Sequence, residues 1–365
     1  MNTDGAKAPT VTIFDVARLA GVSHQTVSRV LNDQPNVREA TRERVQEAIR
    51  QLRYRPSTAA RALVTRRSRT IGLITTGAPD YGPARTLLGF NEAARAARYN
   101  VSISSMLSVD AESMRSSIEL LLDQHVEAIV LITAHRRALE VIAPLELGVP
   151  LVAVDPSGGL GHRSICIDQY RDARLATEHL IALGHRDIQH LAGPTDSPDA
   201  GERLRGWRDV LSEHGLVARP PFFGDWSPAS GYRFGTESFG TGGPGGPSGS
   251  RAVTAVFSAN DQMALGAIHA LSKRRIRVPH DVSLVGFDDI PEAEHFAPPL
   301  TTMRQQFDEL GHGVMSTLLD LLNDRQPAVH VSVPALVVRE STQAGPRARP
   351  VPSAPATDPM SSPVA

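Results

Sequence analysis

From residue 70 onward, short apolar runs alternate with longer stretches whose apolar residues recur at helical spacing. This alternation is typical of parallel strands joined by crossover helices, which cover both faces of the sheet. The apolar runs form two sets, at residues 71–74, 101–103, 128–132 and 151–154 and at 188–191, 252–257 and 282–286. Helical patterns at 85–98, 113–125 and 138–147 lie between the runs of the first set. The sequence therefore predicts an α/β core of two doubly wound lobes.

The ends of these runs predict where the core binds a ligand. Ligands of open parallel sheets bind beyond the carboxyl ends of the strands, and two facing lobes make a cleft there. Carboxylates, amides and hydroxyls at these positions suit a polyhydroxylated ligand such as a sugar, with Trp226 and Phe307 as covers for its ring. The polar strand-end residues are Thr75, Thr76, Thr133, Asp155, Asn260, Asp261, Asp288 and Asp289. The alternative for each aspartate is capping of the following helix.

Three short helices are predicted ahead of the core. Residues 13–20 have helical apolar spacing, with Thr12 as the N-cap and Gly21 as the stop. A second helix is expected at 23–32, with Ser23 as its cap, and a third at 39–52. Two short helices that meet at a tight turn are typical of the helix-turn-helix, whose second helix enters the major groove of DNA.

The outer face of the 23–32 helix carries groups that suit base edges. Its apolar residues face the small core, which leaves four polar side chains outward. These are His24, Gln25, Ser28 and Arg29. Glutamine pairs bidentately with adenine and arginine with guanine, and a serine hydroxyl serves a base or a phosphate. The alternative for this stretch alone is an ordinary amphipathic surface helix.

The charge of the chain is divided unevenly along its length. Residues 1–70 hold 13 Lys and Arg against 6 Asp and Glu, a net charge of +7, whereas the remainder holds 25 against 33, a net charge of −8. A basic N-terminal unit is thus joined to an acidic body. This asymmetry indicates a nucleic-acid module attached to a part that does not bind nucleic acid.

The segment at 54–64 is too short to be a stable helix alone, but it could form one on DNA. Small alanines and a protruding Leu63 suit a helix in the minor groove with an apolar wedge between base steps. The alternative is a plain linker. Arg66, Arg67 and Arg69 then either keep the linker solvated or contact phosphates.

Several other classes of protein are disfavoured. No apolar run reaches 18 residues and no charged-then-apolar leader begins the chain, so we expect a cytoplasmic protein. The single cysteine, Cys166, excludes an internal disulfide and a cysteine-based metal cluster, and we expect it as a buried thiol in a strand at 164–167. No metal or cofactor is expected.

An enzyme is the remaining alternative for the core. Asp155 and Asp288 could be the carboxylate pair of a glycosidase. No Gly-x-Ser-x-Gly nucleophile motif supports catalysis, and His185 and His190 have poor metal-ligand spacing. We therefore expect a binding protein.

Two segments are of low complexity. Residues 240–250 are rich in glycine and proline, lack the Gly-Lys-Ser/Thr of a phosphate loop, and are expected to be a flexible surface insert. The tail from residue 344 onward contains six prolines and is expected to be disordered.

Taken together, the motifs resemble those of the LacI/GalR family of transcriptional regulators. Residues 11–17 and 27–32 are similar to the family's headpiece. The likeness continues in the core at residues 184–185, 191–194, 224–227, 259–266, 285–289 and 298–302. It covers about residues 10 to 340, and the motifs are most similar to those of lactose-type and related glycoside-responsive repressors.

The resemblance implies an all-α helix-turn-helix headpiece at 10–56, a hinge helix and linker at 57–69, and a two-lobed, periplasmic-binding-protein-like core at 70–343. The remaining residues, 344–365, would be a disordered Pro-rich tail. A homodimer would read a near-palindromic operator in double-stranded DNA, with paired hinge helices opening the minor groove at its centre. A periplasmic sugar receptor shares this core, but the headpiece argues against that alternative.

The resemblance also implies site residues. His24, Gln25 and Arg29 would read bases, and Leu63 would be the intercalating wedge. The other implied DNA-binding positions are Thr12, Ser23, Thr26, Ser28, Asn32, Thr41, Tyr54, Ser57 and Ala60. The implied effector-binding positions are Thr76, Tyr81, Pro83, Thr133, Asp155, Arg203, Trp226, Asn260, Asp288, Gln305 and Phe307. The rigid fork of Arg203 suits two vicinal hydroxyls.

The implied function is repression of carbohydrate-utilisation genes, released when a sugar of β-galactoside or β-glucoside type binds the cleft. The alternative is a corepressor-dependent regulator that binds DNA when liganded, as purine-responsive members of the family do.

Some positions depart from the lactose-type pattern. His24 replaces a tyrosine, which predicts different operator bases opposite it. Thr133 replaces an amide and residues 78–83 replace an aliphatic series, which predicts a different effector. The Pro-rich tail replaces C-terminal leucine heptads, so we expect a dimer rather than a tetramer.

Overall fold

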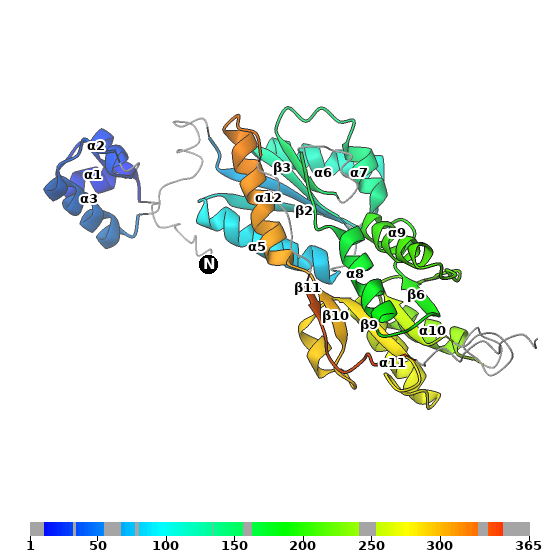
Figure 1. Cartoon of the computed structure of the whole chain (residues 1–365). Coiled ribbons are helices and arrows are strands. Elements are labelled where there is room, and N and C mark those ends of the chain that lie inside the picture. Colours follow the sequence, from blue (N-terminus) through cyan, green and yellow to red (C-terminus); the bar gives the residue numbers. More distant parts are fainter. Residues whose placement is uncertain are drawn as a thin grey trace, which may run out of the picture. The chain divides into compact units, whose positions relative to one another are not determined.

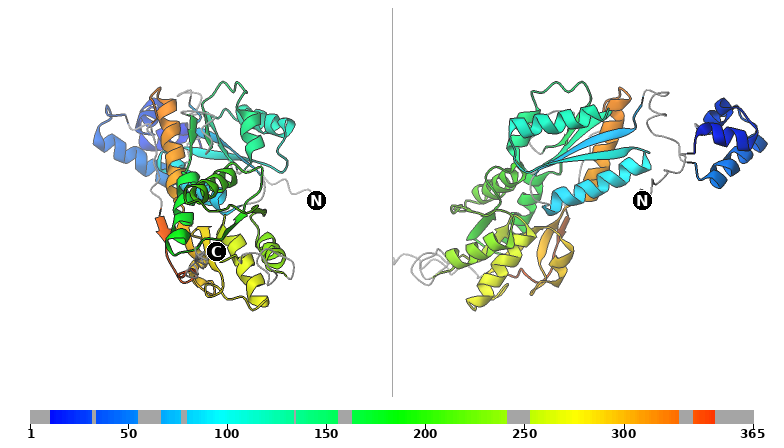
Figure 2. Two further views of the ribbon diagram at one scale, coloured as in Figure 1. Left: turned by 45° about the vertical axis from the view of Figure 1, so that its right-hand side comes forward. Right: turned by 180° about the vertical axis from the view of Figure 1, so that it is seen from behind.

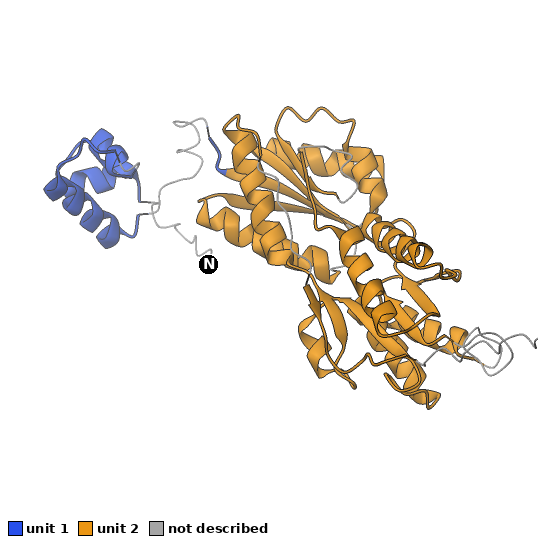
Figure 3. Ribbon diagram, in the orientation of Figure 1, with its two compact units in different colours: residues 1–69 blue, residues 70–365 orange. Residues whose placement is uncertain are grey.

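The computed structural model describes residues 11–31, 34–54, 67–76, 80–133, 135–155, 163–240, 253–327 and 335–345. Figure 3 shows the two compact units of the chain, residues 1–69 and 70–365. In the described residues, no helix is both long enough and apolar enough to cross a membrane. The hinge segment at 57–66, the 241–252 insert and the tail beyond 345 fall outside the described residues.

The N-terminal unit contains the three predicted helices, α1 (Ile13–Ala20), α2 (His24–Leu31) and α3 (Glu39–Leu52). Helix α1 begins at a capping box, in which the Asp15 carboxylate accepts from the Thr12 backbone N–H at 3.0 Å, and it ends at Gly21 with a left-handed φ of 65°. The Ser23 Oγ accepts from the Thr26 N–H at 3.2 Å, as a cap does. Helix α2 therefore begins one residue later than predicted.

A small apolar core holds these three helices together. Small and β-branched side chains fill it, because the helices are short and cross closely. Its buried members are Val16, Ala17, Ala20, Val27, Val30, Val45 and Ala48. This packing fixes the exposed face of α2.

The first lobe of the larger unit is a five-stranded parallel sheet in the order β2-β1-β3-β4-β5. Its strands are β1 (Thr70–Thr76), β2 (Asn100–Met106), β3 (Ala128–Ile132), β4 (Leu151–Val154) and β5 (Ser164–Ile165). Alternate residues point to opposite faces, so Ile71 and Leu73 pack under α5 (Tyr81–Ala96) and α12 (Phe307–Leu322). Ile74 packs on the other face with α6 (Ala111–Asp123) and α7 (Arg136–Ile142).

The second lobe is a six-stranded sheet in the order β11-β10-β9-β8-β6-β7, parallel except for the edge strand β11. Its strands are β6 (Ile188–Ala192), β7 (Phe222–Phe223), β8 (Ala255–Ser258), β9 (Ser283–Asp288), β10 (Thr301–Arg304) and β11 (Ala335–Val337). Helices α8 (Gln169–Ala182) and α9 (Pro198–Glu213) cover one face of the sheet. Helices α10 (Pro228–Ser238) and α11 (Asp261–Lys273) cover the other, and a 3₁₀ helix (Pro291–His295) follows β9.

The predicted class of two doubly wound lobes is confirmed, and each of the seven predicted apolar runs contains a strand. Strand β5 lies within the strand expected at 164–167, whereas the short strands β7, β10 and β11 were not predicted. Cys166 corrects one expectation, because β5 ends at Ile165 and the thiol is only half-buried beyond its end.

The two lobes are not continuous in sequence. The chain leaves the first lobe at residues 166–168, after β5, and returns at 305–306, after β10. Helix α12 therefore follows a strand of the second lobe yet lies beside α5 on the first, as Figures 1 and 2 show. The connections place the starts of α5 and α12 at the junction of the lobes.

Helices α5 and α12 approach closely because glycines face each other. A Cβ at Gly311 would collide with the carbonyl oxygen of Thr86 and the amide nitrogen of Phe90. Gly89 similarly faces the backbone of Asp308. The contact is therefore backbone against backbone, and no rotamer change could relieve an added side chain.

We expect Gly311→Ala to lower the free energy of unfolding by about 1 to 3 kcal/mol, because overpacking outweighs the better helix propensity of alanine. Gly201→Ala in α9 is the matched control, since its Cβ would meet only the Arg136 guanidinium at 3.6 Å. The control should be neutral or more stable by up to about 1 kcal/mol. Urea denaturation of the two variants and the wild type at one protein concentration measures these differences. Equal midpoints for Gly311→Ala and the wild type would show that α5 and α12 can move apart without loss of stability.

Candidate functional site

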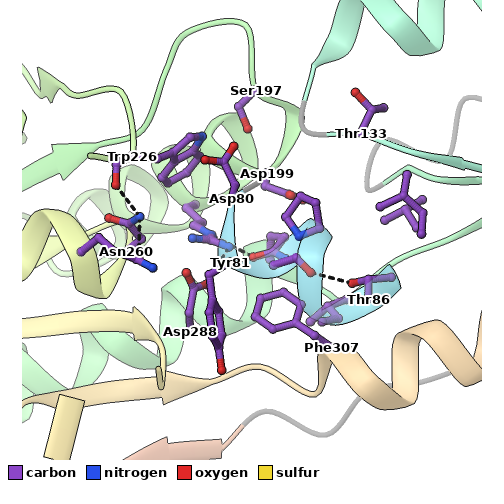
Figure 4. Close-up of a pocket in the computed structure, with 18 of the residues that line it drawn as sticks. Asp80, Tyr81, Thr86, Thr133, Ser197, Asp199, Trp226, Asn260, Asp288 and Phe307 are labelled. Carbon is purple, nitrogen blue, oxygen red and sulfur yellow. Dashed lines mark hydrogen bonds and ion pairs between the residues drawn. The ribbon is translucent and has the colours of Figure 1, made fainter. Parts of the chain in front are cut away.

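A cavity of about 360 Å³ lies between the two lobes, where the carboxyl ends of their strands face each other (Figure 4). The first lobe contributes Asp80, Tyr81, Gly82, Pro83, Thr86, Ile132, Thr133, Val154, Cys166 and Ile167, and α12 adds Phe307 and Leu310. The second lobe contributes Gln169, Ser197, Asp199, Arg203, Asp225, Trp226, Ser227, Pro228, Asn260, Gln262 and Asp288. Its size suits a mono- or disaccharide.

Eight of the eleven predicted effector positions line this cavity. They are Tyr81, Pro83, Thr133, Arg203, Trp226, Asn260, Asp288 and Phe307. Three others lie behind the lining. The Thr76 hydroxyl is 2.6 Å from that of Thr133, Asp155 is only 1% exposed, and the Gln305 amide donates to Asp172 at 2.6 Å.

The sequence analysis missed several lining residues. Ser197 and Asp199 belong to the first turn of α9, which follows the end of β6, and Asp80 directly precedes α5, which follows β1. Ligands of open parallel sheets bind beyond the strand ends, where the following helices begin. The first turns of these helices were therefore the sequence signal that could have identified Asp80, Ser197 and Asp199. Gln169, at the start of α8, has no such signal, because α8 follows a lobe crossing.

Arg203 organises the second-lobe side of the cavity. It is 4% exposed, its Nε donates to Gln169 Oε1 at 2.9 Å, and its Nη1 donates to the carbonyl oxygen of Ala259. Its Nη2 donates to Asp288 Oδ1 at 3.4 Å, and its guanidinium stacks on the Phe287 ring at 3.9 Å. One planar cation therefore ties α8, α9, β8 and β9 together.

Asp288 is a strained and poorly solvated carboxylate. Its φ of 107° lies in the left-handed region, and its side chain is only 6% exposed. Burial, together with the nearby Asp199 and Asp80, raises the pKa of Asp288 to about 7 against the opposing effect of Arg203. This carboxylate therefore binds a proton more readily in the folded protein than in the unfolded chain.

The other strand-end polar residues have structural roles. The Asn260 Oδ1 caps α11 by accepting from the Met263 N–H at 2.9 Å, while its Nδ2 donates to the Trp226 carbonyl at 3.0 Å. Asp261 is fully buried and accepts from the Ile290 N–H and the Thr302 hydroxyl. Asp289 accepts from two arginines of the second lobe. The capping alternative therefore holds for Asn260 even though it lines the cavity.

Aromatic rings form two walls of the cavity. Tyr81 and Phe307, at the starts of α5 and α12, meet edge to face with centroids 5.8 Å apart. Trp226 lies opposite them in Figure 4 and has a left-handed φ of 68°. A Cβ at Gly193 would collide with the Trp226 indole, so the glycine makes room for the ring.

One polar bridge closes the lobes beside the cavity. The His135 Nδ1 lies 3.0 Å from Asp196 Oδ2, and the Arg136 N–H donates to the Asp196 carbonyl at 2.9 Å. His135 belongs to the first lobe and Asp196 to the second. Sliding of one lobe against the other must break or remake this bridge.

The surface of α2 presents the predicted base-reading residues. His24, Gln25 and Arg29 are exposed, whereas Ser28 is half-buried. The His24 ring packs against Phe14 of α1, with centroids 5.1 Å apart, although Phe14 is 59% exposed. Helix α1 therefore supports one edge of the reading surface.

The remaining predicted DNA contacts are distributed around the headpiece. Thr12 and Ser23 are exposed N-caps, Thr26 bonds to the Ser23 hydroxyl at 3.0 Å, and Thr41 and Tyr54 are half-buried at the two ends of α3. Asn32, Ser57, Ala60 and Leu63 lie outside the described residues.

In the described structure, Cys166 is not an activated thiol, and no cluster of side chains is suited to binding a metal ion. Burial and the surrounding aspartates raise the pKa of the Cys166 thiol to about 11, so the thiol stays protonated. Across the described ranges, no group of three His, Cys, Asp or Glu side chains could hold a metal ion.

Two family profiles match the chain. The profile described as bacterial regulatory proteins, lacI family, matches residues 12–57, and the periplasmic binding protein-like domain matches residues 177–342. The Lactose operon repressor of Escherichia coli is 33% identical over 338 residues, covering 92% of this chain and 91% of the repressor. The repressor PurR of Pasteurella multocida is 32% identical over 339 residues, covering 91% and 98%.

Solved structures match over similar lengths. The lac repressor dimer bound to operator and the anti-inducer ONPF has a TM-score of 0.81 at 33% identity, covering 92% of this chain and all of that chain. The complex of the transcriptional regulator CelR with cellobiose has a TM-score of 0.63 at 31% identity, covering 91% and 99%.

We expect Asp288→Asn to flatten the pH dependence of stability between pH 5 and 7. Because the folded protein has the higher pKa, Asp288 favours folding at low pH, and this contribution is lost as the pH rises from about 4 to about 7. The wild type should therefore lose stability relative to the variant by up to about 1.4 kcal/mol per pH unit.

Urea midpoints at pH 5.0, 6.0, 7.0 and 8.0 measure this difference. Asp225→Asn is the control, because hydrogen bonds from Ser227 lower the pKa of Asp225 and its titration lies below the window. A wild-type curve parallel to that of Asp288→Asn would place the Asp288 pKa outside this range.

Proposed function

The chain belongs to the LacI family of bacterial regulatory proteins, and on that premise we propose that a sugar bound in the cavity releases it from a near-palindromic operator. Membership makes it a DNA-binding transcriptional repressor with an effector-binding core, and not an enzyme. The observation that carries the proposal is the cavity itself, in which Arg203 and Asp288 face the aromatic walls of Trp226 and Phe307.

We assign the work to three parts of the chain. Residues 10–56 read DNA through His24, Gln25 and Arg29, residues 57–69 form the hinge with Leu63 as its wedge, and residues 70–343 bind effector and dimerise. The basic headpiece and the exposed face of α2 support the first assignment. The match to a repressor dimer bound to operator supports a homodimer. We propose that this homodimer acts on carbohydrate-utilisation genes in the cytoplasm.

The proposed release is a coupled equilibrium. A sugar that contacts both lobes favours one relative position of the lobes over another, and it changes operator affinity only through that preference. Because β1 begins at Thr70, directly after the hinge segment, movement of the first lobe changes the separation of the two hinges in a dimer. Hinge helices held apart lose their mutual packing and their grip on the minor groove.

Relatives whose solved structures contain sugars support a β-glycoside as the effector of this chain. Solved structures with 33% and 31% identity are those of a lac repressor bound to ONPG and of CelR in complex with cellobiose. The second candidate is a regulator of the same family that binds DNA only when liganded, which is favoured by matches of 30–33% identity to repressors named PurR. The two candidates differ in the sign of the response to ligand.

A fluorescence-anisotropy titration of operator DNA tests the proposal. The operator is first selected from random duplexes with the full chain, and lactose, cellobiose and their β-glycoside analogues are then added. Weaker operator binding, by at least tenfold at saturating sugar, is the expected result. Tighter binding would establish the corepressor alternative, and unchanged binding with every sugar would refute control by these sugars.

We expect Arg29→Ala to weaken binding to the selected operator by about 1 to 3 kcal/mol and to relax the preference at one base pair. The exposed Arg44 of α3 provides the control, because Arg44→Ala removes the same charge away from the reading face of α2. Binding to random DNA should fall little in either variant. Equal losses on operator and on random DNA would reassign Arg29 to a phosphate contact.

A further inference from the structure

The cavity contains more buried negative charge than its own cation can balance. Asp80, Asp199, Asp225 and Asp288 line it, whereas Arg203 is the one arginine or lysine among the residues that line it. The Asp225 carboxylate is turned toward the N–H and hydroxyl of Ser227, and it is exposed. Three carboxylates therefore face the space where a ligand lies.

These three carboxylates have few hydrogen-bond partners of their own. Within the described part of the chain, the one hydrogen bond to their six oxygens comes from Arg203 to Asp288, at 3.4 Å. Asp80 makes no capping bond to α5, and Asp199 has no side-chain partner in the first turn of α9. Only 6% of the Asp288 surface is exposed, yet this residue contributes to the cavity surface. The cavity is therefore rich in unused acceptors.

Two of the strongest donors in the cavity wall, Arg203 and Asn260, are already engaged by the protein. Arg203 directs its donors to Gln169, Ala259 and Asp288. The Asn260 amide gives its two hydrogens to the Trp226 carbonyl and to Gln262. A ligand that supplies donors satisfies the free carboxylate oxygens, whereas a phosphorylated or carboxylated sugar would add negative charge beside them.

The charge distribution also favours an organic cation over a metal ion. Asp80 comes from the first lobe, whereas Asp199 and Asp288 come from the second, and no described group of acidic side chains is close enough to hold a metal. Asp80, Asp199 and Asp288 all line the cavity of about 360 Å³, and Figure 4 shows Asp80 and Asp199 near Trp226. A sugar-sized ligand with one positive group suits a cavity of this size and charge.

We propose that the effector is an amino sugar with a free, protonated amine, which Asp80 and Asp199 bind from opposite lobes. This inference rests on the proposed function, because it names the chemical class of the effector for the same cavity. The ammonium supplies up to three donors and one positive charge, so it meets both deficits of the site. Because the two carboxylates belong to different lobes, binding of the amine also favours the closed arrangement of the cavity.

Isothermal titration of the full-length protein with matched sugars tests this. The probes are the β-1,4-linked disaccharide of glucosamine against cellobiose, and D-glucosamine and D-galactosamine against glucose, galactose and the N-acetylated amines. Within a matched set the ligands differ at the amine, so shape and hydroxyls are held nearly constant. We expect the free amine to bind at least tenfold more tightly than its neutral counterpart at pH 6.5.

Substitutions of the cavity aspartates identify which carboxylates cause the preference for the free amine. Asp199→Asn and Asp80→Asn should reduce the preference for the amine to less than threefold, whereas Asp225→Asn should leave it unchanged, since the Asp225 carboxylate is already bound by Ser227. Melting temperatures of the ligand-free Asp199→Asn and Asp80→Asn proteins should be no lower than that of the wild type, because each of these substitutions removes a carboxylate that lacks a partner of opposite charge among the described residues. A normally folded Asp199→Asn protein that keeps the full preference would overturn the assignment.

The outcomes separate this inference from the proposed function. Equal or tighter binding of the neutral sugars overturns the amino-sugar inference, while operator release by those sugars would still uphold control by sugar. Tight binding of the amine without any change in operator affinity upholds the inference and contradicts release by sugar. Absence of binding by every amine probe overturns the inference.

Discussion

The guanidinium of Arg203 is the interaction on which the geometry of the cavity depends. It comes from α9 and binds a side chain of α8, the backbone after β8 and the carboxylate at the end of β9, while its flat face lies on Phe287. These partners lie at the carboxyl edge of one sheet, and Arg203 links them to one another. A buried cation with four such contacts is costly to remove, because each partner would be left without a donor.

Because Arg203 is engaged in these contacts, the second lobe presents little free positive charge to a ligand. Arg203 is engaged by the protein, while Asp199 and, across the cleft, Asp80 have no partner of opposite charge at hydrogen-bond distance in the described structure. Burial raises the pKa of both carboxyl groups as well as that of Asp288. The cavity is thus stabilised by whatever positive or hydrogen-donating group enters it, which is how a binding site differs from a packed core.

The sequence predicted the fold and eight of the residues that line the cavity, because apolar spacing, helix caps and strand-end positions can be identified from local sequence. The α1 and α3 boundaries followed from caps and apolar spacing, and Arg203, Trp226 and Asp288 followed from the family motifs. Asp199 and Gln169 were missed because their place in the cavity is set by lobe crossings and helix starts that leave no periodic pattern. Asp155 and Gln305 were predicted as lining and lie behind it, since a strand-end position does not fix which way a side chain turns.

Helices α5 and α12 provide a physical route that couples the cavity to the rest of the first lobe. Both helices begin at the cavity, with Tyr81 and Phe307 in edge-to-face contact, and both then run along the sheet with backbone against backbone at Gly89 and Gly311. In such close packing, no flexible side chains lie between the two backbones to accommodate a movement of one helix against the other. A displacement at the start of α5 and α12 therefore moves the two helices as one rigid body. Because α12 begins directly after the crossing from the second lobe, a ligand that draws the lobes together acts on this rigid pair. Through the pair it acts on the sheet that contains β1, which begins at Thr70.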